Sequence, residues 1–177
     1  MEYSKLKETL DWLQTLKFNV GWVDGNKTAE QAYQNLRRKK KTGKNQPSLK
    51  KSVSLALIGR TLNYGREPGV TAEGVRYGRI PARPFMKVAV DIAAKRFPKI
   101  LQRSVPMLMS GMMTRESFKT YVGQRLRDCV VDAMKKSEAY TPLAPSTIKA
   151  RRKHSDVPLI DTGTLLSSVS FEVTEGV

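Results

Sequence analysis

The sequence predicts an α+β fold, in which helices and strands are segregated along the chain. A helical apolar pattern near the N-terminus is followed at once by an alternating segment, 18–24. The middle of the chain is dominated by helical patterns, and a second clear alternating segment, 166–174, comes only near the C-terminus. Because strands and helices do not alternate regularly, a parallel sheet is not expected.

The N-terminal elements follow from spacing. Four leucines three or four residues apart predict an amphipathic helix over 4–17, whose apolar stripe should face a core. The alternating residues 18–24 predict a strand that ends at an Asp-Gly turn signal. Thr28 is a typical N-cap, and a second helix is expected over 29–40.

A strongly basic segment follows. No acidic residue occurs between Gln31 and Arg66, whereas lysine and arginine are frequent there. Its middle, 42–48, offers no side chain for a hydrophobic core. Low hydrophobicity and self-repulsion predict that 39–48 is a flexible basic loop, or arm, until something binds it.

The central elements are marked by glycine and proline. A helix is expected over 49–63, with Gly65 at its C-cap. Residues 67–79 are rich in glycine and predict a loop or an irregular hairpin. Pro84 is suited to the start of the next helix, which should kink or end at Pro98.

The C-terminal third should contain a long helix, a short helix and a strand. Thr114 is expected to cap the long helix, which runs to about Lys136. Between the two longest helices, the methionine-rich run 107–113 either closes a core or contacts another subunit. Pro145 should open the short helix to about Arg152, and 166–174 should form the final strand.

Composition indicates one domain over 1–177. The length of 177 residues is enough for a single core, and the apolar content of 40% is ordinary. The net charge of +16 is unusual and implies an acidic partner, such as nucleic acid or an acidic protein surface. No signal peptide or membrane span is predicted, so a cytoplasmic location is expected during the life of the free chain.

Catalytic and metal chemistry find little support. One cysteine, Cys129, and one histidine, His154, exclude an internal disulfide and a cysteine-based zinc site. We expect Cys129 to be a buried structural thiol and His154 a solvated loop residue. Asp161-Thr162-Gly163 has the letters of an aspartic-protease triplet, but a helix N-cap or an Asx-turn is the better interpretation of Asp161. We therefore predict no enzyme activity, no cofactor and no metal.

Two blocks of sequence resemble a known family. The first comprises Ile58-Gly-Arg-Thr-Leu-Asn-Tyr-Gly65 followed by Ile80-Pro-Ala-Arg-Pro-Phe85. The second runs from the Pro-rich entry at Thr141 through Pro158-Leu-Ile-Asp-Thr-Gly163 to Val173. In this order they resemble the neck and tail-completion proteins of tailed bacteriophages, also described as virion-morphogenesis or minor tail components.

The resemblance implies a fold, a location and partners. The fold would be a small antiparallel sheet packed by two longer helices, in which 20–23 and 168–173 pair. The protein would be a structural part of the virion, at the neck or the top of the tail. It would form a homo-oligomeric ring, with six copies implied, around the DNA channel. Its partners would be copies of itself, neighbouring connector and tail proteins, and DNA without sequence-specific readout.

The expected contacts lie in the arm and near the two blocks. The arm can also be interpreted as a solvated loop without a partner, and the basic residues after 148 as favourable charge at a helix C-terminus. The alternative function is a basic nucleic-acid-binding protein without sequence-specific readout, although no known binding motif is present. The residues predicted to contact other subunits or a polyanion are Arg37, Arg38, Lys39, Lys40, Lys41, Lys44, Arg83, Phe85, Arg151, Arg152, Leu159, Ile160, Asp161 and Thr162.

Overall fold

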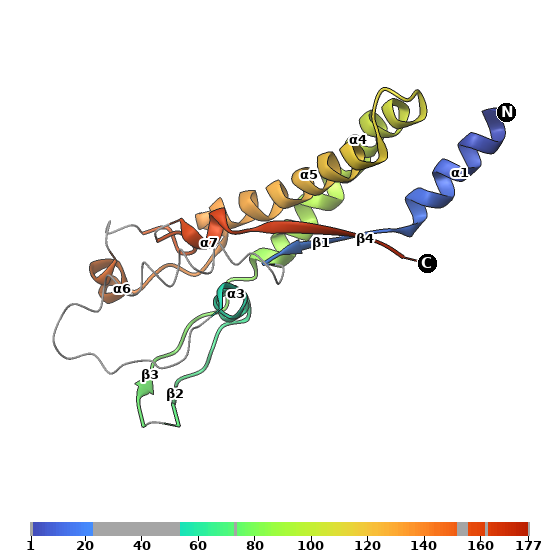
Figure 1. The fold of residues 1–177 in the computed structure, drawn as a ribbon. Helices are drawn as coiled ribbons and strands as arrows, with labels where there is room; N and C mark the ends of the chain where they lie inside the picture. Colours follow the sequence, from blue (N-terminus) through green and yellow to red (C-terminus); the bar gives the residue numbers. More distant parts are fainter. Residues whose placement is uncertain (1, 23–53, 73, 152–155, 162, 177) are drawn as a thin grey trace.

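The computed structural model describes residues 2–22, 54–72, 74–151, 156–161 and 163–176 (Figure 1). The elements in these ranges confirm the α+β class, with a small antiparallel sheet packed by two longer helices. In chain order they are α1 (Glu2–Thr15), β1 (Leu16–Gly21), α3 (Leu55–Tyr64), β2 (Gly69–Val70), β3 (Arg76–Tyr77), α4 (Phe85–Met109), α5 (Arg115–Lys135), a 3-10 turn (Ser137–Ala139), α6 (Pro145–Ala150), α7 (Thr164–Ser167) and β4 (Ser170–Glu175).

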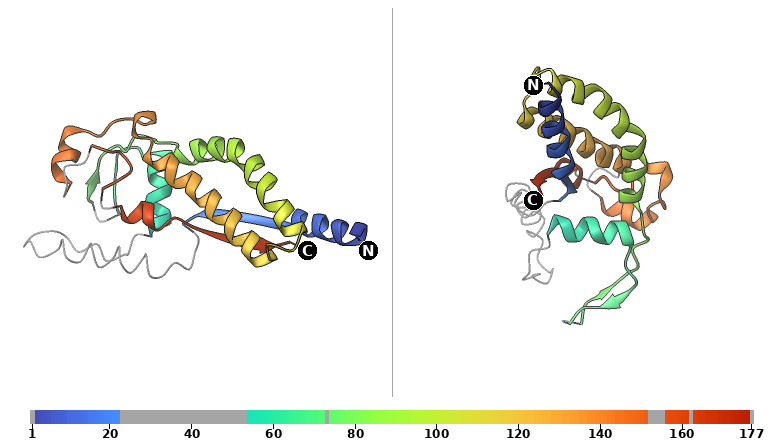
Figure 2. Two further views of the ribbon diagram at one scale, coloured as in Figure 1. Left: turned by 90° about the horizontal axis from the view of Figure 1, so that it is seen from above. Right: turned by 90° about the vertical axis from the view of Figure 1, so that its right-hand side faces the viewer.

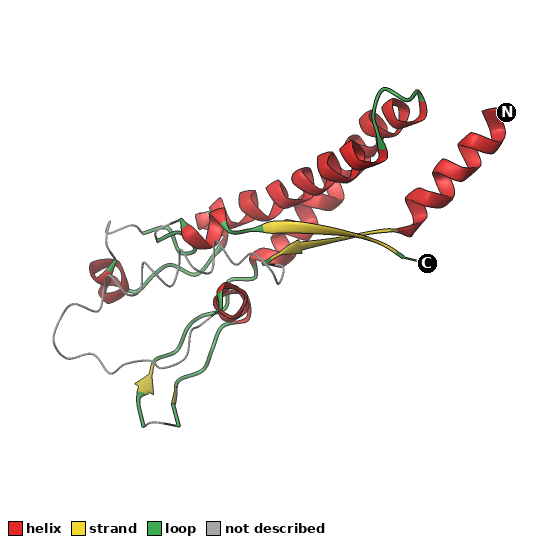
Figure 3. Ribbon diagram, in the orientation of Figure 1, coloured by secondary structure: helices red, strands yellow, loops and turns green. Residues whose placement is uncertain are grey.

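The main sheet joins the two ends of the chain. β1 pairs with β4 in antiparallel register, from Leu16 opposite Glu175 to Gly21 opposite Ser170. This pairing agrees with the partners that the resemblance implied, although the register begins earlier, at Leu16. The short strands β2 and β3 form a separate hairpin in the glycine-rich segment (Figure 3).

The helices α4 and α5 pack against each other, and α5 lies over the β1–β4 pair. Thr114 caps α5 as expected, since its Oγ1 accepts a hydrogen bond of 3.1 Å from the Ser117 amide. Gly65 ends α3 with φ of 76°, as a C-cap glycine. The strand alternation at the chain ends and these two helix caps were both predicted from the sequence.

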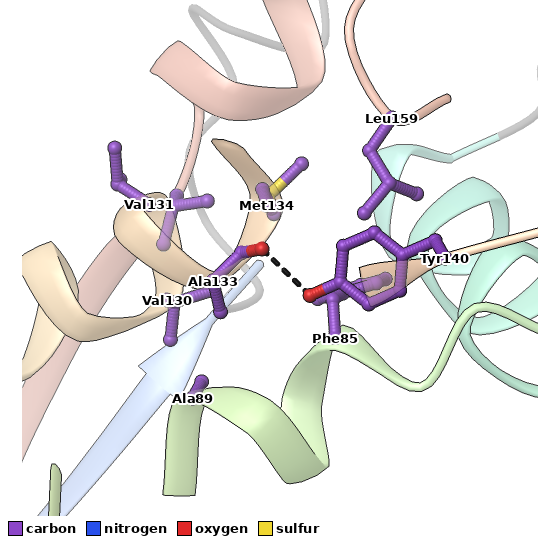
Figure 4. Close-up of a cluster of buried hydrophobic side chains, with 9 residues drawn as sticks. Phe85, Ala89, Val130, Val131, Ala133, Met134, Tyr140 and Leu159 are labelled. Atoms are coloured by element: carbon purple, nitrogen blue, oxygen red, sulfur yellow. Dashed lines mark hydrogen bonds between the residues drawn. The ribbon is translucent and has the colours of Figure 1, made fainter. Parts of the chain in front are cut away.

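Two hydrophobic clusters lie along this helix pair. The inner cluster surrounds Phe85 and Met134 and is shown in Figure 4, where the Tyr140 hydroxyl donates to the Ala133 carbonyl at 2.6 Å. The outer cluster contains Trp12, whose ring meets that of Phe118 edge to face with centroids 5.9 Å apart. The helix pair is therefore fixed at both of its ends by burial.

Of the two outcomes expected at Pro98, a kink or an end of the helix, the end does not occur. α4 continues through Pro98 and Pro106 to Met109, and it bends along its length (Figure 2). Each proline removes one helical hydrogen bond. The helix continues because it contributes Ala89 to the inner cluster and Ile100 to the outer cluster, on opposite sides of Pro98. Burial at both ends offsets the loss.

Two other predicted boundaries also need correction. The first helix stops at Thr15 rather than at Lys17, because Leu16 already belongs to the ladder with Glu175. The last strand starts at Ser170 rather than at Leu166, since 164–167 form the short helix α7. The predicted helix over 29–40 and the arm 39–48 lie outside the described residues.

A glycine sets the distance between α5 and the sheet. A Cβ added at Gly123 would lie 2.2 Å from Cδ2 and 2.9 Å from Cγ of Phe171 on β4. Because Cγ is near the root of that side chain, the ring cannot simply swing away. The close contact between helix and strand therefore requires glycine at this position.

Gly123→Ala is expected to lower the free energy of unfolding by about 1–3 kcal/mol, the usual cost of overpacking. Chemical denaturation of the purified variant measures this change. Gln124→Ala at the next, exposed position is the matched control and should change stability by less than about 0.5 kcal/mol. Equal stability of both variants and wild type would show that the strand can move away from α5 freely.

Candidate functional site

Arg83 fastens the two blocks of the family-like sequence to each other. Its Nε donates to the Thr141 carbonyl at 3.0 Å, and its Nη2 donates to the Pro142 carbonyl at 3.4 Å. A proline-rich segment cannot satisfy its own carbonyls in a helix or ladder, and the forked guanidinium supplies the donors. The side chain is only 3% exposed. Arg83 therefore acts as a clasp between the start of α4 and the entry to the C-terminal segment.

Arg151 forms a second clasp inside the C-terminal block. Its Nη1 donates to the carbonyls of Val157 at 2.5 Å and Ile160 at 3.0 Å, and its Nη2 donates to that of Pro158 at 3.0 Å. These carbonyls belong to the irregular turn after α6. One arginine thus holds the Pro158-Leu159-Ile160 turn in shape.

The two clasps are electrostatically coupled. Burial lowers the pKa of Arg83, and the positive charge of Arg151 lowers it further. Arg83 has no ion pair with a carboxylate among the described residues. The Arg83 guanidinium is therefore held at low exposure by hydrogen bonds to backbone carbonyls. Removing these hydrogen bonds should destabilise the fold.

Several residues that the sequence suggested as contacts lie in the core of the chain itself. Phe85 has no exposed surface and meets Trp22 edge to face, with ring centroids 5.8 Å apart. Leu159 belongs to the same inner cluster and points toward Tyr140 in Figure 4. The expectation that Arg83, Phe85 and Leu159 face a partner is therefore wrong for the folded chain. The motif suggested contacts, but its apolar residues and Arg83 fold the protein.

The remaining predicted residues divide into two groups. Ile160 is half-buried and Asp161 is exposed, so Asp161 stays available for a contact. Asp161 is not the N-cap of α7, because Gly163 occupies that position with φ of 79°. The predicted contacts that lie outside the described residues are Arg37, Arg38, Lys39, Lys40, Lys41, Lys44, Arg152 and Thr162.

An apolar stripe on α1 is exposed, contrary to the expectation that the whole stripe faces a core. Tyr3 is 79% exposed, and Leu6 and Leu10 are also exposed on the same face. Trp12 and Leu13, in the C-terminal half of the helix, pack in the outer cluster. Only this half of α1 therefore contacts the core. Figures 1 and 2 show the N-terminal half of α1 projecting beyond α4 and α5. We call Tyr3, Leu6 and Leu10 the α1 stripe.

A second apolar ridge lies on α3. Leu57 and Tyr64, two turns apart on one face, are 51% and 75% exposed. Gly59 faces the other way, because a Cβ added there would overlap the Trp22 ring at 2.3 Å. We call Leu57 and Tyr64 the α3 ridge. It lies toward the end of the molecule remote from the projecting tip of α1 (Figures 1 and 2).

A basic groove runs between the two long helices. It has a volume of about 650 Å³ and is lined on α4 by Arg96, Lys99 and Arg103, and on α5 by Arg125 and Lys135. We call it the α4–α5 groove. This groove was not predicted from the sequence, which indicated binding by the arm and by residues near the two sequence blocks. The i, i+3, i+7 spacing of the three cations on α4 was the available signal.

Other candidate chemistry is weak. Cys129 is buried as expected, its thiol lies 3.3 Å from the Arg125 carbonyl, and burial raises its pKa. A protonated, inaccessible thiol is a poor nucleophile. In the described ranges no group of three or more His, Cys, Asp or Glu is placed to hold a metal ion. Over the same residues, no helix has the length and apolarity required to cross a bilayer.

Comparison with known proteins identifies no relative of this chain. No protein-family model matches the chain, and neither a curated protein nor a solved structure shows significant similarity to it.

Proposed function

We propose that this chain is a structural subunit of the head-to-tail connection of a tailed phage, acting at the neck or as a tail-completion ring. Several copies would assemble head to tail, with six as the number that the sequence resemblance implies. The ring would surround the DNA channel and meet connector and tail proteins on its two faces. In this proposal the chain is part of the virion and has passed through the host cytoplasm.

The α1 stripe is the observation that carries the proposal. An amphipathic helix normally buries its apolar face, and most helical stability in proteins comes from that burial. Here the N-terminal half of the helix extends from the body with Tyr3, Leu6 and Leu10 exposed. A contiguous exposed apolar surface of this kind is typical of an interaction site.

The α3 ridge supplies a candidate partner surface. It lies on a different part of the molecule from the α1 stripe, so that one copy could present its stripe to the ridge of the next. Such a heterologous contact leaves one free surface of each kind in every partial assembly, and the assembly stops growing only when the ring closes. The two arginine clasps support the proposal indirectly. Arg83 links the two family-like blocks to each other, and Arg151 holds the turn in the second block in shape.

The proposed contact between the α1 stripe of one copy and the α3 ridge of the next can be tested with two complementary variants. Leu6→Glu/Leu10→Glu should abolish the α1 stripe, and Leu57→Glu/Tyr64→Glu should abolish the α3 ridge. All four side chains are exposed, so the folded monomer should persist. By mass photometry and light scattering, wild type should form a closed oligomer and each variant should be a monomer.

Mixing the two variants gives the decisive result. Each keeps one intact surface, so the mixture should form a 1:1 dimer and nothing larger. A mixture that remains monomeric would contradict the head-to-tail contact. A single variant that dimerises on its own would indicate an isologous contact instead. Wild type that remains monomeric at high concentration would contradict the ring itself. The matched control is Val70→Glu/Val75→Glu in the exposed β2–β3 hairpin, which should still assemble.

A further inference from the structure

We propose that the α4–α5 groove is a binding site for the phosphate backbone of nucleic acid. This site is distinct from the basic arm and does not depend on assembly into a ring. It is built entirely from described side chains on the two long helices α4 and α5. The recognition would be independent of base sequence, because it involves phosphates alone.

The charge balance inside the groove favours an anionic ligand. Two carboxylates line it together with the five cations. Asp132 pairs with Arg96 at 2.6 Å, and Asp128 lies 3.5 Å from Arg127, which is outside the groove. In the part of the chain that the structure describes, no ion pair involves the other four lining cations, Lys99, Arg103, Arg125 and Lys135. Both acids are thus engaged, and the groove keeps a local excess of positive charge.

The cations lie on both sides of the groove, and those on α4 form a row that suits a charged polymer. On α4, Arg96 to Arg103 spans seven residues, or ~10 Å at the helical rise. On α5, Arg125 and Lys135 stand ten residues, or ~15 Å, apart, with Asp128 and Asp132 between them. Each strand of a duplex carries a phosphate about every 3.4 Å along the axis, so the α4 row is long enough to meet neighbouring phosphates of one strand.

The character of the groove favours phosphate over an acidic protein surface. Protein interfaces are normally depleted of charge at their centre and rely on apolar anchors there. The aliphatic side chains at the base of this groove, Ile100 and Val131, are already buried in the two clusters of the chain. Arg125 stacks over the Tyr121 ring at 5.3 Å, which holds one guanidinium in place while leaving its charge unneutralised. The long cationic side chains around this groove suit phosphates better than they suit an acidic protein surface.

The test compares two charge-matched variants of the full chain. The groove variant is Lys99→Ala/Arg103→Ala/Arg125→Ala. The control variant removes the same charge from exposed positions outside the groove, as Arg76→Ala/Lys87→Ala/Lys149→Ala. Fluorescence anisotropy with a 30-base-pair duplex of random sequence measures affinity between 50 and 200 mM salt. Because the arm is intact in both variants, its contribution cancels in the comparison.

The groove variant should bind more weakly, and the slope of log K against log salt should become shallower by about 2 to 3, since each lost phosphate contact contributes about 0.9. The control should keep a slope close to that of wild type. Equal loss in both variants, or no loss in either, would overturn the proposal. Loss of poly-glutamate binding with unchanged duplex binding would also overturn it and indicate an acidic protein partner.

The readout separates this site from the proposed ring. The groove variant should form the same oligomer as wild type by mass photometry, since it retains the α1 stripe and the α3 ridge. A groove variant that lost both assembly and DNA binding would overturn the claim that the site is independent of the ring.

Discussion

Replacing Phe85 with alanine is expected to lower the free energy of unfolding by about 3–5 kcal/mol, the range found for buried aromatic residues. Phe85 has no exposed surface, and it stands where α4 begins, between Trp22 and the C-terminal half of α5. Truncation would remove the edge-to-face contact and leave a cavity that the surrounding helices cannot fill completely. Since single domains are commonly stable by only about 5–15 kcal/mol, much of the folded population could be lost.

Denaturant unfolding followed by circular dichroism measures this loss. The matched control is Val90→Ala, which is in the same helix but 64% exposed and should cost less than about 0.5 kcal/mol. The experiment also separates the two interpretations of Phe85. If Phe85→Ala were as stable as wild type yet failed to assemble, then the residue would face a partner, as its motif first suggested.

Replacing Arg83 with methionine should destabilise the chain by about 3 kcal/mol and loosen the segment that follows α5. The change keeps most of the side-chain volume but removes the donors to the carbonyls of Thr141 and Pro142. Hydrogen bonds from a charged group contribute about 1.5–3 kcal/mol each. Thr141 and Pro142 are exposed, so water can replace part of what their carbonyls lose. Relief of the buried charge recovers part of this cost, so the net loss should be smaller than the sum.

Hydrogen exchange measured by mass spectrometry locates the effect. Amides of α6, such as those of Thr147 and Ile148, should exchange faster in Arg83→Met than in wild type, while α5 amides near Val122 should change little. Arg83→Lys should give an intermediate result, because it keeps the charge but lacks the fork. Arg79→Met, in the same loop but with a side chain 71% exposed, should leave exchange unchanged. Uniformly faster exchange across the chain would instead indicate global destabilisation without a local clasp.

The parts of the fold that sequence predicted well are those fixed by local chemistry. Thr114 caps α5 and Gly65 ends α3, because a short side chain and a residue tolerant of positive φ satisfy helix ends wherever they occur. The terminal strands were recognisable because their alternation has a period of two. The class followed from the order of these elements.

The parts that sequence predicted poorly depend on neighbours distant in the chain. Pro98 has the same local effect in any helix, and only the buried contacts on both sides of it explain why α4 continues. Leu6 and Leu10 repeat with the spacing of a core stripe, yet nothing in that spacing states how far the body of the protein extends along α1. Arg83 and Arg151 appeared to be surface charges, because the carbonyls that they bind belong to turns whose path the sequence does not reveal.

Cys129 is a native reporter of local opening in this protein. Its sulfur is the only thiol in the sequence and lies on the buried side of α5. An alkylating reagent can reach it only when α5 lifts from its surroundings, so the rate of modification counts openings of the helix pair without any introduced label. The rate of Cys129 modification can therefore be compared between the free and the assembled protein with the same reagent.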